Sequence, residues 1–393
     1  MITVDEALAR VLALARSLPA EPVALAQGAG RVLLADAVAP RAQPPFAASA
    51  MDGYAIAAAP APGQVYRVAG TAQAGTAFAG TVSPGQAVRI FTGAPVPAGT
   101  ACVVIQEDVA RDDDRITVLD TLGTGTNIRP VGADFPAGHR LPAPRRLRPA
   151  DLALLAAMNC PQLSVARRPV VALIATGDEL VLPGEVPGPD QIVASNIFAL
   201  KAMAEAEGAA TRLLPIARDT EAALRDVLAM AAGADVIVTI GGASVGDHDL
   251  VARVAGAMGL DRAFHKIAMR PGKPLMSGRL GDAILLGLPG NPVSAIVCGH
   301  LFLLPLLRAM QGLPDAAPQV RQARLARALP ANGPRAHYMR ATLTPAEGLP
   351  RIDPYSDQDS GRLTPLAAAD ALLIRPIGDA ARPEGAVVDY LPL

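Results

Sequence analysis

Tryptophan is absent from this 393-residue sequence, aromatic residues make up only 3% of it, and the formal net charge is −1. Because large aromatic side chains contribute so little, Ala, Val and Leu must do most of the core packing. A net charge this close to zero provides no electrostatic footprint for nucleic acid or for an anionic membrane surface. We therefore expect no nucleic-acid or membrane partner, and local groups must hold any anionic ligand.

Cysteine is also scarce, with only Cys102, Cys160 and Cys298 present. These residues are too few and too scattered for a disulfide framework or a CxxC zinc site, and the five histidines show no metal-ligand spacing. The N-terminus has no signal-peptide pattern. The most apolar run, residues 295–307, is shorter than the ~20 residues that span a bilayer. The sequence therefore predicts a soluble, cytoplasmic protein with reduced thiols.

Predicted elements divide the chain into regions of different character. An amphipathic helix at residues 3–16 is followed, from residue 46 to about 137, by short strands between Gly- and Pro-rich turns, which is typical of a small β domain. A helix at 151–158 is expected to pack back on the first helix, which would make the first domain discontinuous. Short strands return over 318–393 and indicate a compact β-barrel-like module.

Strands and helices alternate between residues 168 and 310. The predicted strands are 170–175, 212–216, 236–240, 263–268 and 283–288, and helices begin at Asn196, Thr220, about Asp249 and Pro292. Alternation at these lengths predicts a parallel sheet covered by helices on both faces.

Polar turns follow three of these strands. Gly241-Gly242-Ala243-Ser244-Val245-Gly246 brings backbone N–H groups together without Cβ bulk, which suits an anion such as phosphate. The segments T-G-D-E-L at 176–180 and P-G-N-P-V-S at 289–294 follow two other strands. If the sheet is parallel, all three turns line one crevice at the carboxyl ends of the strands, where α/β folds bind ligands.

Charged side chains complete this predicted site. A helix N-terminus contributes only ~0.3–1 kcal/mol toward an exposed anion, so a multiply charged phosphate ligand also needs cations. Lys273 and Arg270 lie in a basic loop after another strand and can supply positive charge. Glu179, Asp247 and Asp249 could hold Mg²⁺, which proteins usually bind through one or two carboxylates plus ligand phosphates. The set has the chemistry of a metal–nucleotide site.

Taken singly, each element has a simpler interpretation. The glycine turn could be a tight connection, Asp178-Glu179 could cap or solvate a helix start, residues 289–292 could only begin a helix, and Lys273 could be a surface lysine. Their convergence at strand ends favours a binding site. Neither a G-x-S-x-G elbow nor a G-x-x-x-x-G-K-[ST] loop is present, which argues against a hydrolase triad and a Walker ATPase.

Seven motifs in order resemble those of the molybdopterin molybdenumtransferase family, to which the E domain of gephyrin is related. They are S-A-M-D-G-Y-A at 49–55, T-G-A-P-V-P-A-G at 92–99, N-I-R-P-V-G-A-D at 127–134, T-G-D-E-L at 176–180, G-G-A-S-V-G-D-H-D at 241–249, R-P-G-K-P at 270–274 and G-L-P-G-N-P-V-S at 287–294. The resemblance covers essentially the whole chain.

The resemblance implies a multidomain α/β-plus-β protein that forms an elongated homodimer with a shared active-site cleft. The implied domains are a discontinuous linking domain (1–42 and 138–166), a β-rich insert domain (43–137), a central three-layer α/β molybdopterin-binding domain with a parallel-type sheet (167–314), and a C-terminal β-barrel-like domain (315–393).

A reaction is implied as well: adenylylated molybdopterin and molybdate give molybdenum-molybdopterin and AMP, with Mg²⁺ required. Positions that the family uses functionally are Asp52, Thr92, Asp134, Glu179, Asp249, Lys273, Pro289 and Pro292. Glu179, Asp249 and a partner subunit's copy of Asp52 would position Mg²⁺. Pterin and nucleotide contacts are expected from Thr176, Gly241, Gly242, Ser244, Gly246, Arg270, Lys273, Gly290, Asn291 and Ser294, with Arg129 and Ser360 in support.

Three positions depart from the family pattern: Arg270 stands where lysine is common, Ala243 where valine is usual, and Asp247 where glutamate is usual. Asp247 leaves open which carboxylate of the turn meets the metal. A molybdopterin adenylyltransferase is one rival, although it would lack the β domains that carry Asp52 and Thr92. A gephyrin-like scaffold is the other, although no additional α/β domain or long linker is visible. A tungstate-handling variant and a transient contact with the adenylyltransferase also fit.

Overall fold

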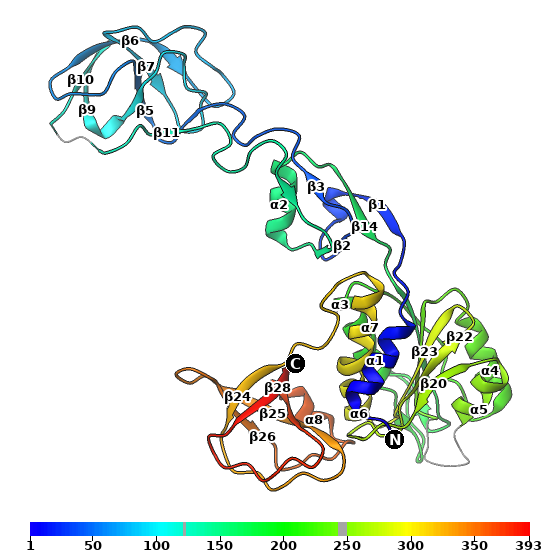
Figure 1. Cartoon of the computed structure of the whole chain (residues 1–393). Coiled ribbons are helices and arrows are strands. Elements are labelled where there is room, and N and C mark those ends of the chain that lie inside the picture. Colours follow the sequence, from blue (N-terminus) through cyan, green and yellow to red (C-terminus); the bar gives the residue numbers. More distant parts are fainter. Residues whose placement is uncertain (121–122, 243–249) are drawn as a thin grey trace.

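The computed structural model describes residues 1–120, 123–242 and 250–393. The chain is elongated, with a β-rich region at one end and an α/β region beside a small barrel at the other (Figure 1). A narrow region built from two separate segments joins the ends. This arrangement confirms the expected multidomain α/β-plus-β fold; the domain limits given above stay a prediction.

The N-terminal helix α1 (Val4–Leu14) begins as expected, because the Thr3 hydroxyl accepts a hydrogen bond of 3.1 Å from the Glu6 N–H. Its buried residues Val4, Ala7 and Val11 join the core of the α/β region. The expectation that this helix packs against the helix at 151–158 was therefore wrong. Sequence spacing defines the apolar stripe of a short helix but does not specify which neighbour covers it.

The linking region contains a four-stranded antiparallel sheet in the order β1-β14-β2-β13. Its strands come from two distant parts of the chain, so this region is discontinuous. Their bounds are β1 Ala20–Ala24, β2 Val32–Leu33, β13 Arg145–Arg146 and β14 Gln162–Ala166; β3 (Ala37–Val38) pairs with β12 (Arg140–Leu141), and η1 (Leu25–Gln27) and α2 (Pro149–Ala157) complete the region.

The β-rich region has a six-stranded sheet in the order β8-β5-β7-β6-β10-β9. Tyr54 and Ile56 enter one apolar cluster and Ala55 another, which is the alternation expected of a strand buried on both faces. The elements are β5 Gly53–Ile56, β6 Val65–Ala72, β7 Gln86–Ile90, β8 Cys102–Ile105, η2 Gln106–Asp108, β9 Val109–Asp112 and β10 Arg115–Val118, with β4 (Ala48–Ser49) paired to β11 (Ile128–Arg129). Strands β9 and β10 pair antiparallel and form a hairpin whose tip is at residues 112–114.

The α/β region has a six-stranded sheet in the order β18-β15-β19-β23-β22-β20, whose first four strands are mutually parallel. Side chains of the sheet alternate between two apolar clusters, which makes three layers. One cluster lies under α1, α3, α6 (Pro292–Cys298) and α7 (Leu304–Met310), and the other lies under α4 and α5. The elements are β15 Val170–Ala175, β16 Leu180–Val181, β17 Ile192–Val193, α3 Asn196–Ala206, β18 Ala210–Leu213, α4 Glu221–Met230, β19 Val236–Ile240, α5 Leu250–Ala257, β20 Asp261–His265, β22 Met276–Leu280 and β23 Ala283–Leu288.

Strand β22 was not predicted. It forms an antiparallel hairpin with β23, and β20 pairs antiparallel to β22. The sheet is therefore mixed at this edge, although β20 still runs in the same direction as β23. The basic loop after β20 therefore begins on the side of the sheet where the parallel strands have their carboxyl ends, as predicted.

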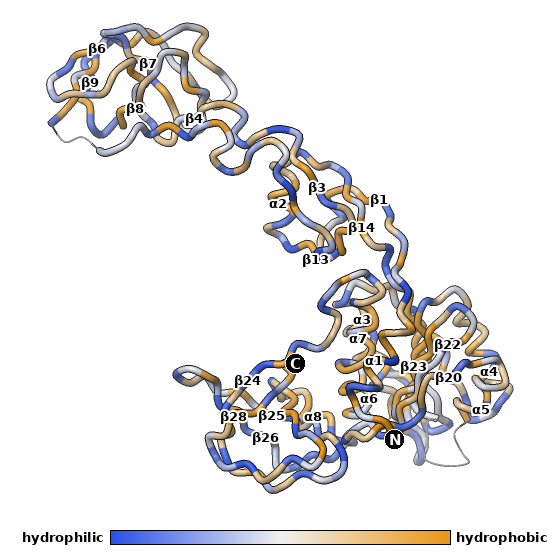
Figure 2. Tube along the Cα trace, viewed as in Figure 1, coloured by the Kyte–Doolittle hydropathy of each residue, from blue (hydrophilic) through white to orange (hydrophobic). Residues whose placement is uncertain are grey.

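A continuous helical run covers residues 292–310 as α6 (Pro292–Cys298), the π-helical turn η3 (Gly299–Leu303) and α7 (Leu304–Met310). This run of 19 residues is long and apolar enough to cross a membrane by length and composition, but 78% of the tested window is buried inside the protein. Core helices of soluble proteins share this length and composition. The buried side chains of the run belong to the larger apolar cluster of the α/β region, and Figure 2 marks α6 and α7 with hydrophobic colour.

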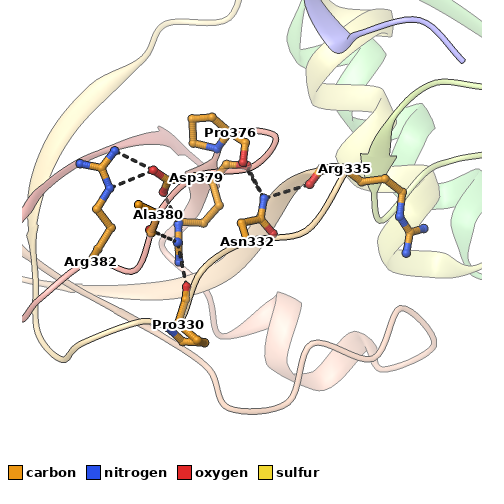
Figure 3. A network of polar contacts seen from close by, with 8 residues as sticks. Pro330, Asn332, Arg335, Pro376, Asp379, Ala380 and Arg382 are labelled. Atoms are coloured by element: carbon orange, nitrogen blue, oxygen red, sulfur yellow. Dashed lines mark hydrogen bonds and ion pairs between the residues drawn. The ribbon is translucent and has the colours of Figure 1, made fainter.

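The C-terminal strands form a closed five-stranded barrel, because β25 pairs with both β26 and β27. The elements are β24 Arg321–Leu325, β25 Ala336–Thr344, β26 Arg351–Pro354, α8 Leu363–Ala367, β27 Ala371–Arg375 and β28 Val387–Pro392, and β21 (Met269–Arg270) adds to β25 from the basic loop. Figure 3 shows the polar network that ties the end of β27 to its neighbours. There the buried carboxylate of Asp379 accepts hydrogen bonds from Arg375 (2.6 Å) and Arg382 (2.7 Å).

Candidate functional site

A cavity of about 890 Å³ lies where the sequence predicted a crevice, at the carboxyl ends of β15, β19 and β23. Its size falls within the range of small-molecule sites, roughly 300–1,000 Å³. The described residues that line it and were predicted to bind ligand are Thr176, Glu179, Gly241, Gly242, Pro289, Gly290, Asn291, Pro292 and Ser294. The parallel topology thus brings together three turns that are far apart in sequence.

Gly241 and Gly242 allow two of these turns to touch. Both have positive φ, +97° and +64°, and a Cβ on Gly241 would lie 2.7 Å from the carbonyl oxygen of Thr176. A Cβ on Gly242 would lie 2.9 Å from the Thr176 hydroxyl. Thr176 itself is buried, and its N–H donates to the carbonyl of Ile240 at 3.0 Å. Only glycine fits both the backbone conformation and this contact.

The rest of the glycine turn, including Ala243, Ser244, Gly246, Asp247 and Asp249, lies outside the described residues. The parts of the prediction that depend on these positions therefore remain predictions.

The two adjacent acids after β15 have different environments. Asp178 accepts a hydrogen bond of 3.1 Å from the Asp219 N–H, so it fastens two strand-end loops together. Glu179 is exposed, lines the cavity, and folds back over Gly177, where a Cβ would lie 2.3 Å from its carboxylate. Glu179 is therefore the carboxylate of this pair that is placed to meet a ligand.

The turn after β23 is fastened by the C-terminal barrel region. Ser360 accepts a hydrogen bond of 3.0 Å from Asn291 Nδ2 through its hydroxyl, and one of 3.1 Å from the Val293 N–H through its carbonyl. One N–H of the first helical turn is thus already satisfied by protein and is not available to an anion. Ser360 was predicted as a supporting residue, and in this structure its two bonds hold the cavity wall.

The two cationic side chains that were predicted, Arg270 and Lys273, lie beside the cavity instead of in its wall. Of the basic loop, only Pro274 lines the cavity; Arg270 is exposed on β21, opposite His337 of β25, and the Lys273 carbonyl accepts from the Ile267 N–H. Burial lowers the pKa of His337 to about 4, and the nearby Arg270 acts in the same direction. His337 is therefore neutral at neutral pH, and Arg270 and Lys273 supply the positive charge here.

Several cavity residues were not predicted, and three of them carry polar groups that bear on the site. Asp219 adds a second carboxylate, Arg253 adds a guanidinium, and the Asn196 side chain donates to the Gly290 carbonyl at 2.7 Å. Asp219 follows β18, a strand that ends at the same edge of the sheet as β15. The strand-end rule that located the other turns would have found this aspartate too.

The carboxylates at the cavity fit one type of metal site. In the described part of the chain, no group of three or more His, Cys, Asp or Glu side chains could hold a metal ion. Glu179 and Asp219 nevertheless both line the cavity. One or two carboxylates are what Mg²⁺ commonly takes from a protein when ligand phosphates complete its coordination.

The predicted residues of the β-rich region lie far from this cavity within one chain, because β5 and β11 are at the opposite end of the molecule from β23 (Figure 1). Asp52 Oδ1 accepts hydrogen bonds from the Thr92 N–H (2.7 Å) and the Thr92 hydroxyl (2.8 Å). These bonds hold the pKa of Asp52 below its usual range. Arg129 and Asp134 are exposed in the same region. The structure therefore brings Asp52 and Thr92 together but separates them from Glu179.

Three family profiles match consecutive parts of the chain. They are "MoeA N-terminal region (domain I and II)" over residues 2–159, "Probable molybdopterin binding domain" over 172–309, and "MoeA C-terminal region (domain IV)" over 322–393. Together with the geometry they define a multidomain protein built around a molybdopterin-binding type of α/β region.

Individual relatives agree with these profiles. The chain is 37% identical over 297 residues to the molybdopterin molybdenumtransferase of Nostoc sp., covering 74% of this chain and 68% of that one. It is 36% identical over 364 residues to molybdopterin molybdenumtransferase 2 of Mycobacterium tuberculosis, covering 89% of each. The crystal structure of the molybdopterin biosynthesis MoeA protein of Pyrococcus horikosii superposes with a TM-score of 0.82 at 29% identity, covering 100% of this chain and 99% of that one. The chain belongs to the MoeA family.

Proposed function

We propose that this chain inserts molybdenum from molybdate into adenylylated molybdopterin and releases AMP, as a transferase of molybdenum cofactor synthesis. The observation that carries the proposal is the cavity at three parallel strand ends, where Thr176, Gly241 and Gly290 meet beside Glu179. Relatives named molybdopterin molybdenumtransferase and the profile for a molybdopterin-binding domain support it.

In this proposal the chain's own residues act mainly by binding and orientation. Thr176, Gly241, Gly242, Gly290, Asn291 and Ser294 would hold the pterin and the nucleotide phosphates, together with Ser244 and Gly246, while Pro289 and Pro292 fix the turn after β23. Arg270 and Lys273 would attract molybdate toward the dithiolene sulfurs. Correct positioning can supply roughly 7–11 kcal/mol of a reaction barrier.

We propose further that Mg²⁺ is required. Glu179 and Asp249, with the partner subunit's Asp52, would hold the ion against the pyrophosphate that joins molybdopterin to adenylate. When bound, Mg²⁺ would supply charge stabilisation on the phosphoryl oxygens as the bond to AMP breaks. The two cavity carboxylates, Glu179 and Asp219, support a site completed by ligand phosphates.

A second subunit is part of the proposal, because Asp52 and Thr92 lie at the other end of the molecule from the cavity of their own chain (Figure 1). In a homodimer with a shared cleft, the partner subunit's Asp52 and Thr92, with Arg129 and Asp134 nearby, would approach the cavity.

The proposed domains are residues 1–42 with 138–166, 43–137, 167–314 and 315–393, although the packing of α1 places residues 4–14 against the α/β core. We also propose a cytoplasmic location and a transient contact with the molybdopterin adenylyltransferase.

The direct test is to incubate the purified chain with adenylylated molybdopterin, Mg²⁺ and molybdate, and to measure AMP. The proposal expects AMP release that depends on molybdate. The adenylyltransferase alternative instead expects pyrophosphate from ATP and molybdopterin without molybdate. A scaffold would give neither product.

A further inference from the structure

A second cavity, of about 530 Å³, lies away from the strand ends at the junction of four chain segments. These are residues 144–146 of the linking region, the helical run 292–310 with the residue that follows α3, residues 313–319 between α7 and the barrel, and the last strand, β28. Among the described residues, none lines both cavities. The lining residues that the argument uses are Arg145, Arg308, His300, Glu207, Leu304 and Leu313.

Guanidinium groups outnumber carboxylates in the wall of this cavity, because Arg145, Arg146 and Arg308 line it together with Glu207 and Asp315. One of those carboxylates, Glu207, is already shared: Arg146 Nη2 donates to it at 2.7 Å, and Arg308 Nε donates at 2.9 Å. Arg145 is paired through Nε with Asp151 at 3.3 Å. Within the described part of the chain, the Nη atoms of Arg145 and Nη1 of Arg308 make no hydrogen bond, so these donors can bind an anion.

His300 lines this cavity from an irregular turn of the helical run 292–310. Residues 299–303 form a π-helical turn in which the Leu304 N–H donates to the Gly299 carbonyl. Pro305 cannot donate to the fourth residue before it, and the wider turn accommodates this missing bond. Burial lowers the pKa of His300 to about 4, with Arg308 acting in the same direction. The ring is therefore neutral at neutral pH and offers one N–H donor and one acceptor.

Most of the other lining residues are leucines and prolines, namely Pro144, Leu304, Leu313, Pro314, Pro318, Leu391 and Pro392, and Asp315 and Gln319 add two polar side chains. A cavity of this size with one polar side and one apolar side suits a small organic ligand. Guanidinium groups match the geometry of phosphate oxygens in particular.

We propose that this cavity binds a small phosphate monoester with an apolar body. The phosphate lies against Arg145, Arg308 and His300, and the apolar part lies against Leu304 and Leu313. Because Arg145 belongs to the linking region and Arg308 to the α/β region, such a ligand fastens one region to the other. The site is separate from the one proposed for molybdenum insertion.

Phenyl phosphate is a suitable probe, with phenol as the uncharged control. Binding to the full-length chain is measured by isothermal titration calorimetry, and hydrogen exchange of residues 139–148 and 299–319 locates it. The key variant is Arg145→Gln, and the matched control is Arg148→Gln. Arg148 also pairs with Asp151, at 3.3 Å, but does not line the cavity. Lys273→Gln reports on binding at the other cavity.

The proposal expects saturable binding of phenyl phosphate but not of phenol, with slower exchange in both segments. Arg145→Gln should weaken binding by roughly tenfold or more, as expected for loss of a charged hydrogen bond, whereas Arg148→Gln and Lys273→Gln should leave it unchanged. The proposal is overturned if binding does not saturate, if the two arginine variants behave alike, or if only Lys273→Gln weakens it.

Discussion

Asn291 and Ser360 are 69 positions apart in the sequence, yet Asn291 Nδ2 donates a hydrogen bond of 3.0 Å to Ser360 Oγ. Through this bond, and through the Ser360 carbonyl on the Val293 N–H, the barrel region fixes the turn that forms one wall of the candidate site. The C-terminal region therefore contributes to the geometry of the cavity without supplying its main lining.

Ser360→Ala removes the side-chain half of this contact and keeps the backbone half. We expect a loss of about 1 kcal/mol in unfolding free energy, typical of one hydrogen bond, and a higher KM for adenylylated molybdopterin because the wall is less well held. Urea unfolding and AMP release measure the two effects. Ser356→Ala, at an exposed serine nearby, is the control and should change neither. Equal effects of both variants would contradict the assigned role.

Gly241→Ala should be costly for two separable reasons. Its φ of +97° is unfavourable for alanine, at about 1–2 kcal/mol, and the new Cβ would lie 2.7 Å from the Thr176 carbonyl oxygen. Gly233→Ala is the matched control, because Gly233 has a φ of +79° and a Cβ added there would meet no atom within 4 Å. We expect Gly241→Ala to reduce the unfolding free energy more than Gly233→Ala, by roughly 1–3 kcal/mol of overpacking, and to reduce turnover as well. Equal losses in urea unfolding would show that the close approach does not matter.

Much of the site could be predicted, because the carboxyl ends of parallel strands lie on one side of the sheet. The apolar run 236–240, which glycines follow directly, therefore locates one turn of the site. The missed elements have physical reasons. Strand β22 (Met276–Leu280) includes Ser277, Gly278 and Arg279 and lacks a clear apolar alternation. The partner of α1 depends on tertiary packing, and the Asn291–Ser360 bond joins regions that no local pattern connects.

Arg340 is 1% exposed, and its guanidinium donates to the carbonyls of Arg362 (2.8 Å) and Asp357 (3.2 Å). It therefore holds the loop that carries Ser360. Arg340→Met leaves these partly buried acceptors without that donor, and we expect a loss of about 1–3 kcal/mol of unfolding free energy with faster hydrogen exchange over 355–362. Arg351→Met is the control, because it breaks only exposed contacts, the pair with Glu384 and a hydrogen bond of 3.3 Å to the Ala326 carbonyl, and should cost less than about 1 kcal/mol. Unchanged exchange in the loop would remove this role from Arg340.

Asp52 depends on Thr92 for its low pKa. The backbone hydrogen bond from Thr92 is the main cause, and the bond from its hydroxyl is the second. Because the folded-state pKa is lowered, the stabilising effect of this contact is present at neutral pH and is lost as the pH falls through the folded-state pKa. Thr92→Val removes only the hydroxyl, so the pKa of Asp52 should rise part of the way toward its usual value.

Carboxyl-carbon NMR titration of the labelled protein measures this change. Thr100→Val is the control, because its hydroxyl donates to the Pro97 carbonyl in the same region and not to Asp52. A pKa of Asp52 that is the same in Thr92→Val and in the unsubstituted protein would show that the hydroxyl does not matter.

In the proposed homodimer, the cavity of one chain and the Asp52–Thr92 pair of the other form one site for molybdenum insertion. The most direct measurement is molybdate-dependent AMP release by a mixture of two variants, Asp52→Ala and Glu179→Gln, after their subunits are allowed to exchange. Each variant alone should be inactive while remaining folded. We expect the mixture to regain activity, because each mixed dimer contains one site with both carboxylates intact. A mixture as inactive as its components, when mixed dimers are present, would contradict it.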